Sequence, residues 1–131
     1  MAAQTPDLIE KHAGLGPLAT RLVEVDQMAW RETRFPGIRV KVLMEDKETG
    51  MATTLFQWAP GSELPLHEHT AIEQSFVLEG SLEDHEGVCT AGNYVWRPGG
   101  SRHVARAPQG ALVLSFFTRP NRFFDTPEGA L

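Results

Sequence analysis

The sequence predicts an all-β fold, a small antiparallel sandwich or barrel. Residues 38–45 alternate apolar side chains, beginning with Ile38 and Val40, with mostly polar ones. This period of two is typical of a strand with one face toward a core. Turn signals recur about every 8–12 residues, as in small sandwiches and barrels, and no amphipathic helix of useful length interrupts the series.

Each expected strand ends at a turn signal. Gly80 is expected to stop the strand that begins at residue 73, and Gly61, Gly92 and Gly100 are expected in turns, because glycine adopts backbone angles that other residues avoid. A short helix capped by Thr5 is expected before the strands. The strands are expected at residues 38–44, 51–58, 64–69, 73–79, 93–97, 102–105 and 112–117.

The length of 131 residues fits one domain. Residues 1–20 are expected to form an N-terminal lead-in, residues 21–118 the barrel, and residues 119–131 a C-terminal tail. The strand pattern is confined to the middle range, and neither flank carries a repeat or a linker of its own.

Charge and composition exclude several function classes. The chain has 12 Lys and Arg against 17 Asp and Glu, a net charge of −5, which disfavours nucleic acid and anionic membranes as partners. No apolar run is long enough to span a membrane, and no signal peptide is visible. Cys89 is the single cysteine, so no internal disulfide forms. These features together predict a cytoplasmic protein.

Four residues form a candidate metal site. His67 and His69 lie two apart, so on a strand both point to the same face. Glu73 follows a short turn, and His103 comes from a strand distant in sequence. Imidazoles and a carboxylate suit one divalent transition metal per chain, namely iron, zinc, nickel or manganese. The remaining histidines, at positions 12 and 85, are expected at the surface.

The segments that carry these residues resemble the two signature motifs of the cupin superfamily. They read G-x5-H-x-H-x3-E-x6-G over residues 61–80 and G-x5-P-x-G-x2-H over residues 92–103. The resemblance implies a double-stranded β-helix, or jelly roll, with the metal inside the barrel. It implies His67, His69, Glu73 and His103 as ligands. The second motif departs at Ala107, where the family usually has asparagine.

Further residues resemble the cupin domain of ChrR-type anti-sigma factors, a subgroup that includes relatives of acetylacetone-cleaving dioxygenases. This resemblance implies a metal-dependent dioxygenase acting on a small carbonyl or diketone compound, and frequent homodimers. The alternative is a non-catalytic metal-binding or ligand-sensing module; the enzyme is favoured. In the acetylacetone-cleaving members histidines alone hold the iron, so Glu73 is a departure. The resembling residues are Trp30, Phe35–Ile38, Lys41–Leu43, Pro60–Gly61 and Val77–Leu82.

The roles of the other aromatic and basic residues stay open. Tyr94 and Trp96 share one strand face, where core packing is favoured over lining a pocket. Arg97 is expected to be an exposed cation rather than a substrate-binding group. Trp58, Phe76, Phe116 and Phe117 are expected in the core. The aromatic pairs at 116–117 and 123–124 support a homodimer.

Overall fold

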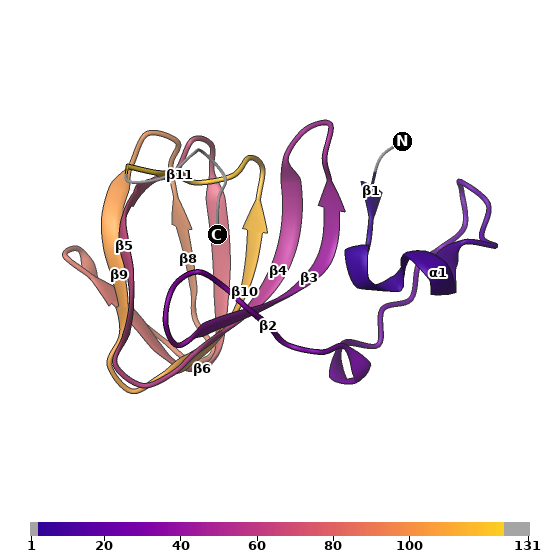
Figure 1. Ribbon diagram of the computed structural model, residues 1–131. Helices are drawn as coiled ribbons and strands as arrows, with labels where there is room; N and C mark the ends of the chain where they lie inside the picture. The colour runs from indigo at the N-terminus through magenta and orange to yellow at the C-terminus, as the bar shows by residue number, and fades with distance from the viewer. Residues whose placement is uncertain (1–2, 125–131) are drawn as a thin grey trace.

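The computed structural model describes residues 3–124, and their strands form one curled antiparallel sheet (Figure 1). The strand order is β1-β3-β4-β10-β6-β9-β5-β11, with β2 on β3 and with β7 and β8 on β6. This arrangement confirms the expected all-β jelly roll. The strands are β1 (Ala3–Gln4), β2 (Arg31–Glu32), β3 (Ile38–Asp46), β4 (Met51–Trp58), β5 (Ser62–Glu68), β6 (Glu73–Asp84), β7 (Gly87–Thr90), β8 (Tyr94–Arg97), β9 (Arg102–Ala107), β10 (Ala111–Phe117) and β11 (Arg122–Phe123).

Strand β6 belongs to both walls of the barrel, because it bends at Gly80. Its first half pairs with β8 and β10, and its second half pairs with β7 and reaches β9. The expectation that Gly80 ends the strand is therefore wrong. Gly80 has a φ of 70°, and a Cβ built there would lie 2.0 Å from the carbonyl oxygen of Gly110. Only glycine fits this crossing point.

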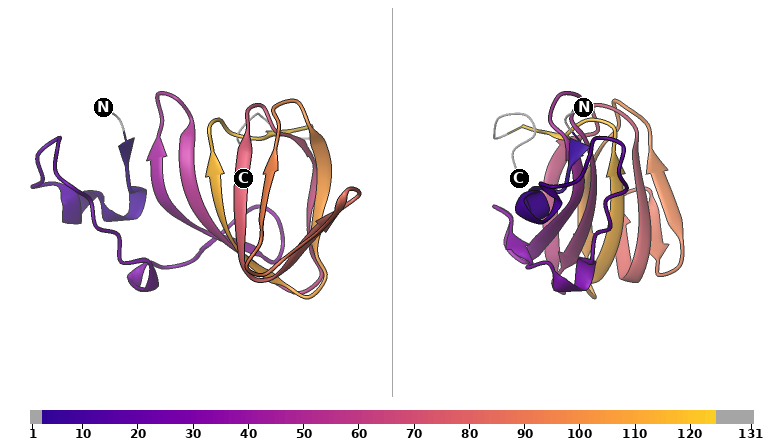
Figure 2. Two further views of the ribbon diagram at one scale, coloured as in Figure 1. Left: turned by 180° about the vertical axis from the view of Figure 1, so that it is seen from behind. Right: turned by 90° about the vertical axis from the view of Figure 1, so that its right-hand side faces the viewer.

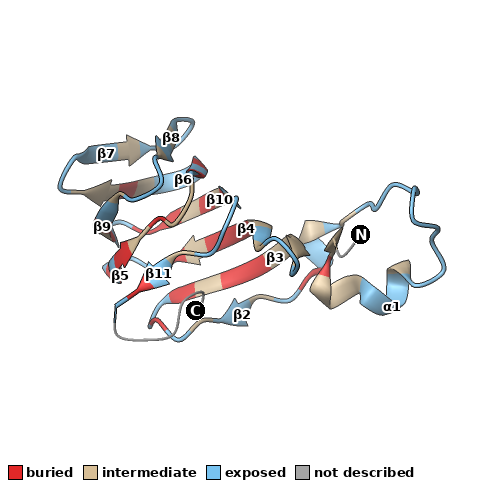
Figure 3. Cartoon of the chain, turned by 90° about the horizontal axis from the view of Figure 1, so that it is seen from above, coloured by how far each residue is buried: buried red, intermediate tan, exposed pale blue. Residues whose placement is uncertain are grey.

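The apolar core closes one end of the barrel. Ile38 pairs with Trp58, and Trp58 pairs with Ala111, so one row of inward side chains crosses three strands. On the opposite wall, Leu64 pairs with Ala105. Figure 3 shows buried residues on β3, β4, β10, β6 and β5, around the inside of the curled sheet. The fully buried core includes Ile38, Val77, Val113 and Ala107.

A bulge in β5 directs the first histidine of the motif into the barrel. The pairing of β5 with β9 shifts between Leu64 and His67, so both of these residues point inward although three positions separate them. His67 then pairs with His103 across the two strands. His69 follows directly after the end of β5 and is also buried.

Both flanks contribute to the sheet. The lead-in pairs β1 with β3 and forms a short helical segment of η1 (Pro6–Leu8) and α1 (Ile9–His12). Thr5 precedes it, but the Thr5 hydroxyl donates to the carbonyl of Leu43 rather than capping. In the expected tail, β11 pairs with β5, while residues 125–131 lie outside the described residues. Among residues 3–124, no helix has the length and apolarity to cross a membrane.

Candidate metal centre

Three buried histidines meet inside the barrel. His67 comes from β5, His69 from the turn after it, and His103 from β9. One ring nitrogen of each lies within 4.8 Å of those of the other two. The Nε2 atoms of His67 and His103 are only 3.0 Å apart. The sequence therefore identified a group of histidines that is able to hold a metal.

The opposite ring nitrogens all have partners that accept a hydrogen. His67 Nδ1 lies 2.8 Å from the carbonyl oxygen of Pro65, and His103 Nδ1 lies 2.7 Å from Oδ2 of Asp84. His69 Nδ1 lies 2.9 Å from the hydroxyl of Ser101. That hydroxyl donates to the carbonyl of Pro98, so it accepts from His69. These partners assign the proton of each neutral imidazole to Nδ1 and leave a lone pair on Nε2.

The three Nε2 atoms lack protons to share among themselves. Because both Nδ1 atoms are protonated, the Nε2 atoms of His67 and His103, 3.0 Å apart, face each other with a lone pair each and no proton between them. The Nε2 atom of His69 is buried and has no hydrogen-bond partner. A cation satisfies all three lone pairs at once, and imidazole is a preferred ligand of borderline transition metals. The donor set thus fits a bound transition metal.

Burial keeps these imidazoles neutral. Removal from water lowers the pKa of His67 and of His69 to about 4, and that of His103 to about 3. The positive charge of Arg97 acts in the same direction on all three. Partial burial opposes ionisation of Asp84, but the hydrogen bonds from His103 and from the Glu86 backbone, together with the nearby positive charge of Arg97, outweigh it and lower the pKa of Asp84. Metal ligation needs neutral imidazoles, so this environment favours it.

Glu73 lies beside the histidines but has other partners. Its Oε2 is 3.4 Å from His69 Nε2 and accepts a hydrogen bond of 3.3 Å from the Asn121 side chain. Its Oε1 pairs with the Arg97 guanidinium at 3.3 Å and with the Ser75 hydroxyl at 3.4 Å. The buried group of donors within 4.8 Å of one another contains the three histidines without Glu73; a second group, Asp84, His85 and Glu86, lies mostly exposed at the surface.

Arg97 differs from its expected role as an exposed cation. It pairs with Glu73 across β8 and β6, and only 13% of its side chain is exposed. Cross-strand pairing explains this position, because directly opposed residues on neighbouring strands point to the same face. Arg97 therefore reaches the barrel interior together with Glu73.

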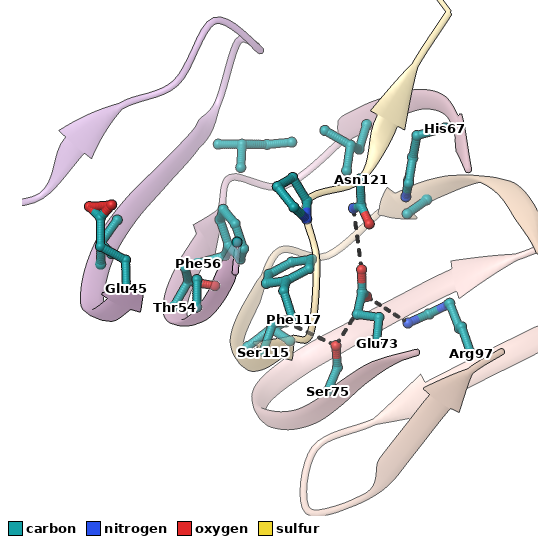
Figure 4. Close-up of a pocket in the computed structure, with 18 of the residues that line it drawn as sticks. Glu45, Thr54, Phe56, His67, Glu73, Ser75, Arg97, Ser115, Phe117 and Asn121 are labelled. Carbon is teal, nitrogen blue, oxygen red and sulfur yellow. Dashed lines mark hydrogen bonds and ion pairs between the residues drawn. The ribbon is translucent and has the colours of Figure 1, made fainter. Parts of the chain in front are cut away.

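A cavity of about 390 Å³ adjoins the histidine group. His67, His103 and Glu73 border it, and the opposite walls are mostly apolar side chains such as Phe56 and Phe117. Figure 4 shows Glu73 between Arg97, Ser75 and Asn121, with His67 nearby. The hydroxyls of Ser75 and Ser115 lie 3.0 Å apart on the wall below Glu73; Thr54, the cross-strand neighbour of Ser115, continues this row.

Sequence reasoning missed Asp84, Asn121, Ser75 and Ser115. Asp84 and Asn121 lie in turn-like contexts that give no signal of a contact with the site. The inward position of Ser75 follows from alternation with Glu73, so the sequence did hold a signal for that residue. The exposed position expected of His85 is confirmed, and His12 lies half-buried beside the carbonyl of Leu22.

A jelly-roll barrel that gathers three histidines from these motifs inside it defines a cupin. The family model described as ChrR Cupin-like domain matches residues 19–121. The chain therefore belongs to the ChrR cupin-like domain family. A search of curated proteins finds no match.

Solved structures share this fold. A candidate acetylacetone dioxygenase from Methylibium petroleiphilum PM1 is 23% identical, with a TM-score of 0.75 over 86% of this chain and 88% of that one. The acetylacetone dioxygenase from Acinetobacter johnsonii is 22% identical, with a TM-score of 0.73 over 80% and 78%. The structure of Rhodobacter sphaeroides SigE in complex with the anti-sigma ChrR contains a chain 21% identical, with a TM-score of 0.61 over 71% and 50%.

Proposed function

We propose that this protein is a metal-dependent dioxygenase that acts on a small carbonyl compound of the β-diketone type. The observation that carries the proposal is the position of the histidine group at the wall of a cavity. His67 and His103 border about 390 Å³ of space, rather than being enclosed by protein on every side. An accessible centre favours catalysis, whereas an enclosed one favours a structural role. Similarity of fold to two acetylacetone dioxygenases, one of them a candidate, supports the same choice.

The proposed metal ligands are His67, His69 and His103, with Glu73 as a fourth and displaceable ligand. When bound, an iron ion supplies Lewis-acid and redox chemistry to oxygen-containing ligands. The imidazoles are oriented by their Nδ1 hydrogen bonds before any ligand arrives. Glu73 is less strictly directed at the histidines than the imidazoles are at one another, because its Oε1 contacts Arg97 and Ser75 instead.

The cavity selects the substrate class by its size and lining. A volume of about 390 Å³ lies at the lower end of the range for small-molecule sites. Apolar walls exclude water and accept hydrocarbon groups, while the polar side chains of Glu73, Arg97 and Asn121 gather at the histidine end. A compact molecule with two neighbouring oxygens at one end and short alkyl groups at the other fits this distribution.

The test is anaerobic loading with iron(II), followed by oxygen-uptake measurements against a panel of β-diketones and phenolic ketones. We expect uptake that requires both the iron and a diketone. The His103→Ala variant should lose it, and the matched His85→Ala variant, which removes an exposed histidine, should keep it. Absence of uptake over the whole panel by protein that holds iron stoichiometrically would rule out the proposal.

The position of Glu73 has its own test. Replacing Glu73 with glutamine keeps its size and removes its charge, so we expect metal affinity to fall by about tenfold, the loss of one weak ligand. The matched control is Glu79→Gln, an exposed position on the same strand. Isothermal titration with zinc compares the two variants. A loss of a hundredfold or more in Glu73→Gln would make Glu73 a full ligand instead.

A non-catalytic metal-binding or ligand-sensing module is the second candidate. It is favoured by the family itself, whose description names the cupin-like domain of ChrR. The ChrR structure was determined with SigE, but this chain spans only half of that matched chain. A module of this kind would retain metal and bind small ligands without consuming oxygen, so the same uptake experiment separates it from the enzyme.

Assembly and location belong to the proposal as well. We expect a homodimer that takes a small molecule and binds neither nucleic acid nor membranes. A cytoplasmic location is expected because a chain with a single cysteine forms no internal disulfide and so does not require an oxidising compartment. Size-exclusion chromatography with light scattering tests the dimer.

A further inference from the structure

The outer face of the sheet carries aromatic side chains where polar ones are expected. Phe76 on β6 pairs with Tyr94 on β8, and Gln74 pairs with both Trp96 and Phe116. Directly opposed residues share a face, so these side chains gather on the outside of β8, β6 and β10. Trp96 is 56% exposed and Tyr94 is 50% exposed. We call Phe76, Tyr94, Trp96 and Phe116 the aromatic face.

This face corrects the expectation that the same four residues pack in the core. Tyr94 and Trp96 do border a surface pocket, which they share with residues of β7. A sheet with one face in water normally alternates apolar inward residues with polar outward ones. Here the inward neighbours Glu73 and Ser75 on β6 are polar and border the cavity beside the histidines. The outward aromatic residues therefore need another partner.

The chain covers the other half of this surface with its own N-terminal segment. Lys41 on β3 points outward yet is buried, because its ammonium group donates to the carbonyl of Val25 at 2.6 Å and lies 4.6 Å from the ring of Trp30. Residues 25–30 thus lie over β3 and β4. Across β10, β6 and β8, no described segment of the chain covers the aromatic rings.

A second unpartnered apolar surface lies on the segment of residues 9–24, which we call the arm. Leu18 is 97% exposed and Leu22 is 77% exposed, and Ile9 and Leu15 are exposed as well. The arm nevertheless has structure, because the Arg21 guanidinium donates to the carbonyls of Gly16 and Ala19. Figures 1 and 2 show that it projects beyond β3, away from the barrel.

The arm cannot reach the aromatic face of its own chain. The sheet order places β3 at one end of the wall and β8 at the other, with β4, β10 and β6 between them. Four inter-strand spacings of about 4.8 Å make roughly 19 Å, and the arm extends in the opposite direction from β8. Only another molecule is able to bring these two surfaces together.

We infer that the aromatic face is the docking surface for a second copy of this chain, whose arm lies across β10, β6 and β8. Two-fold symmetry makes the contact reciprocal, so each copy gives one arm and one face. An aromatic side chain has a surface of about 150–250 Å². The exposed parts of the four aromatic side chains, counted on both copies, therefore amount to roughly 600–900 Å². The arm leucines raise the buried area toward the ~1,200 Å² of a stable interface.

Sedimentation velocity of the full chain between about 1 and 100 µM tests this interface. We expect a dimer in the wild type, and a shift of at least tenfold toward monomer in both Trp96→Glu on the face and Leu18→Glu on the arm. Leu66→Glu is the matched control, because Leu66 is exposed on β5, outside both surfaces. Zinc binding by each variant confirms that it is folded.

A second measurement detects the contact directly. In a Cys89→Ala background, chains carrying Leu18→Cys are mixed with chains carrying Phe76→Cys under mild oxidation. We expect a covalent dimer, and no such product when Leu66→Cys replaces Phe76→Cys. A wild type that is monomeric at every concentration overturns the inference. So does a dimer broken by Trp96→Glu but unaffected by Leu18→Glu, which would leave the face paired without the arm.

Discussion

The two ends of the barrel interior are built on different principles. At the closed end, Ile38, Trp58 and Ala111 lie in one cross-strand row and belong to the buried hydrophobic cluster. At the other end, His67 and His103 are just as deeply buried but are polar, and each has a hydrogen-bond partner that fixes its ring. The side chains at the two ends are buried to a similar degree, but those at one end are apolar and those at the other are potential metal ligands.

Polar groups in a core are costly unless they are satisfied. The closed end leaves only the Trp58 indole N–H without a partner among its row of side chains, whereas the histidine end gathers several lone pairs at one point. The Nε2 lone pairs face one another, and that of His69 has no partner. A sequence selected only for stability would place apolar side chains there, as the closed end does. The difference assigns stability to one end and ligand binding to the other, and substitutions at each end should affect different measurements.

The largest expected effect is at the histidine end. His103→Ala removes one of three imidazoles and the hydrogen bond to Asp84 Oδ2, so metal affinity should fall by more than about a hundredfold, beyond what loss of an outer partner costs. Zinc titration monitored by calorimetry measures this. His85→Ala serves as the control, and equal affinity in the two variants would show that the metal binds elsewhere.

The closed end should show the opposite result. Ile38 is almost completely buried, so Ile38→Ala should lower the free energy of unfolding by about 2–5 kcal/mol and leave zinc affinity within about twofold of wild type. Leu66→Ala, at an exposed position, should stay within about 0.5 kcal/mol. Urea unfolding checks both. A large loss of metal affinity in Ile38→Ala would mean that the two ends are coupled.

Local sequence rules predicted the strands and the histidine group because both depend on short-range spacing. The alternation from Ile38 onward and the His-x-His pair are visible within a few residues. The bend at Gly80 depends instead on the close approach of Gly110, thirty positions later, which no local rule contains. The same glycine that looked like a stop signal is a crossing point between two walls.

Which side chains of a strand point into the barrel was harder to predict than where the strands lie. Alternation separates Phe76 from Ser75, and hydrophobicity alone chooses Phe76 as the inward residue, although alternation with the expected ligand Glu73 favours Ser75. The structure reverses this choice, because Ser75 lies beside Glu73 at the polar, histidine end of the cavity. Arg97 was misassigned for the same reason: its position follows from its cross-strand neighbour Glu73, which becomes known only with the sheet register.

An intermediate effect is expected from the residue that orients His103. Asp84→Asn keeps the size of the side chain but weakens the hydrogen bond to Nδ1, so the imidazole loses both its fixed orientation and part of its basicity. Metal affinity should fall about ten- to a hundredfold. The matched control is Glu86→Gln, in the exposed turn that follows. Unchanged affinity in Asp84→Asn would mean that packing alone orients His103.

The smallest expected effect on metal affinity concerns pH, and here the stability of the protein and its metal affinity should separate. An unfolded histidine has a pKa of about 6.5, while the folded pKa is about 4 for His67 and His69 and about 3 for His103. Between these values the unfolded chain binds more protons than the folded one. The free energy of unfolding of the metal-free protein should therefore fall as the pH falls from about 6.5 to 4.

Metal affinity of the folded protein should hardly change over most of this range. Protons compete with the metal only near the folded pKa values, so zinc affinity should fall by less than about tenfold between pH 8 and pH 5. Three histidines with an unperturbed pKa of about 6.5 would lose more than about a thousandfold over the same interval. Competition with a chelator calibrated at each pH measures the affinity. A loss of a thousandfold by pH 5 would mean that water reaches the histidines freely. The two ends of the barrel would then differ in their residue types but not in how well they exclude water.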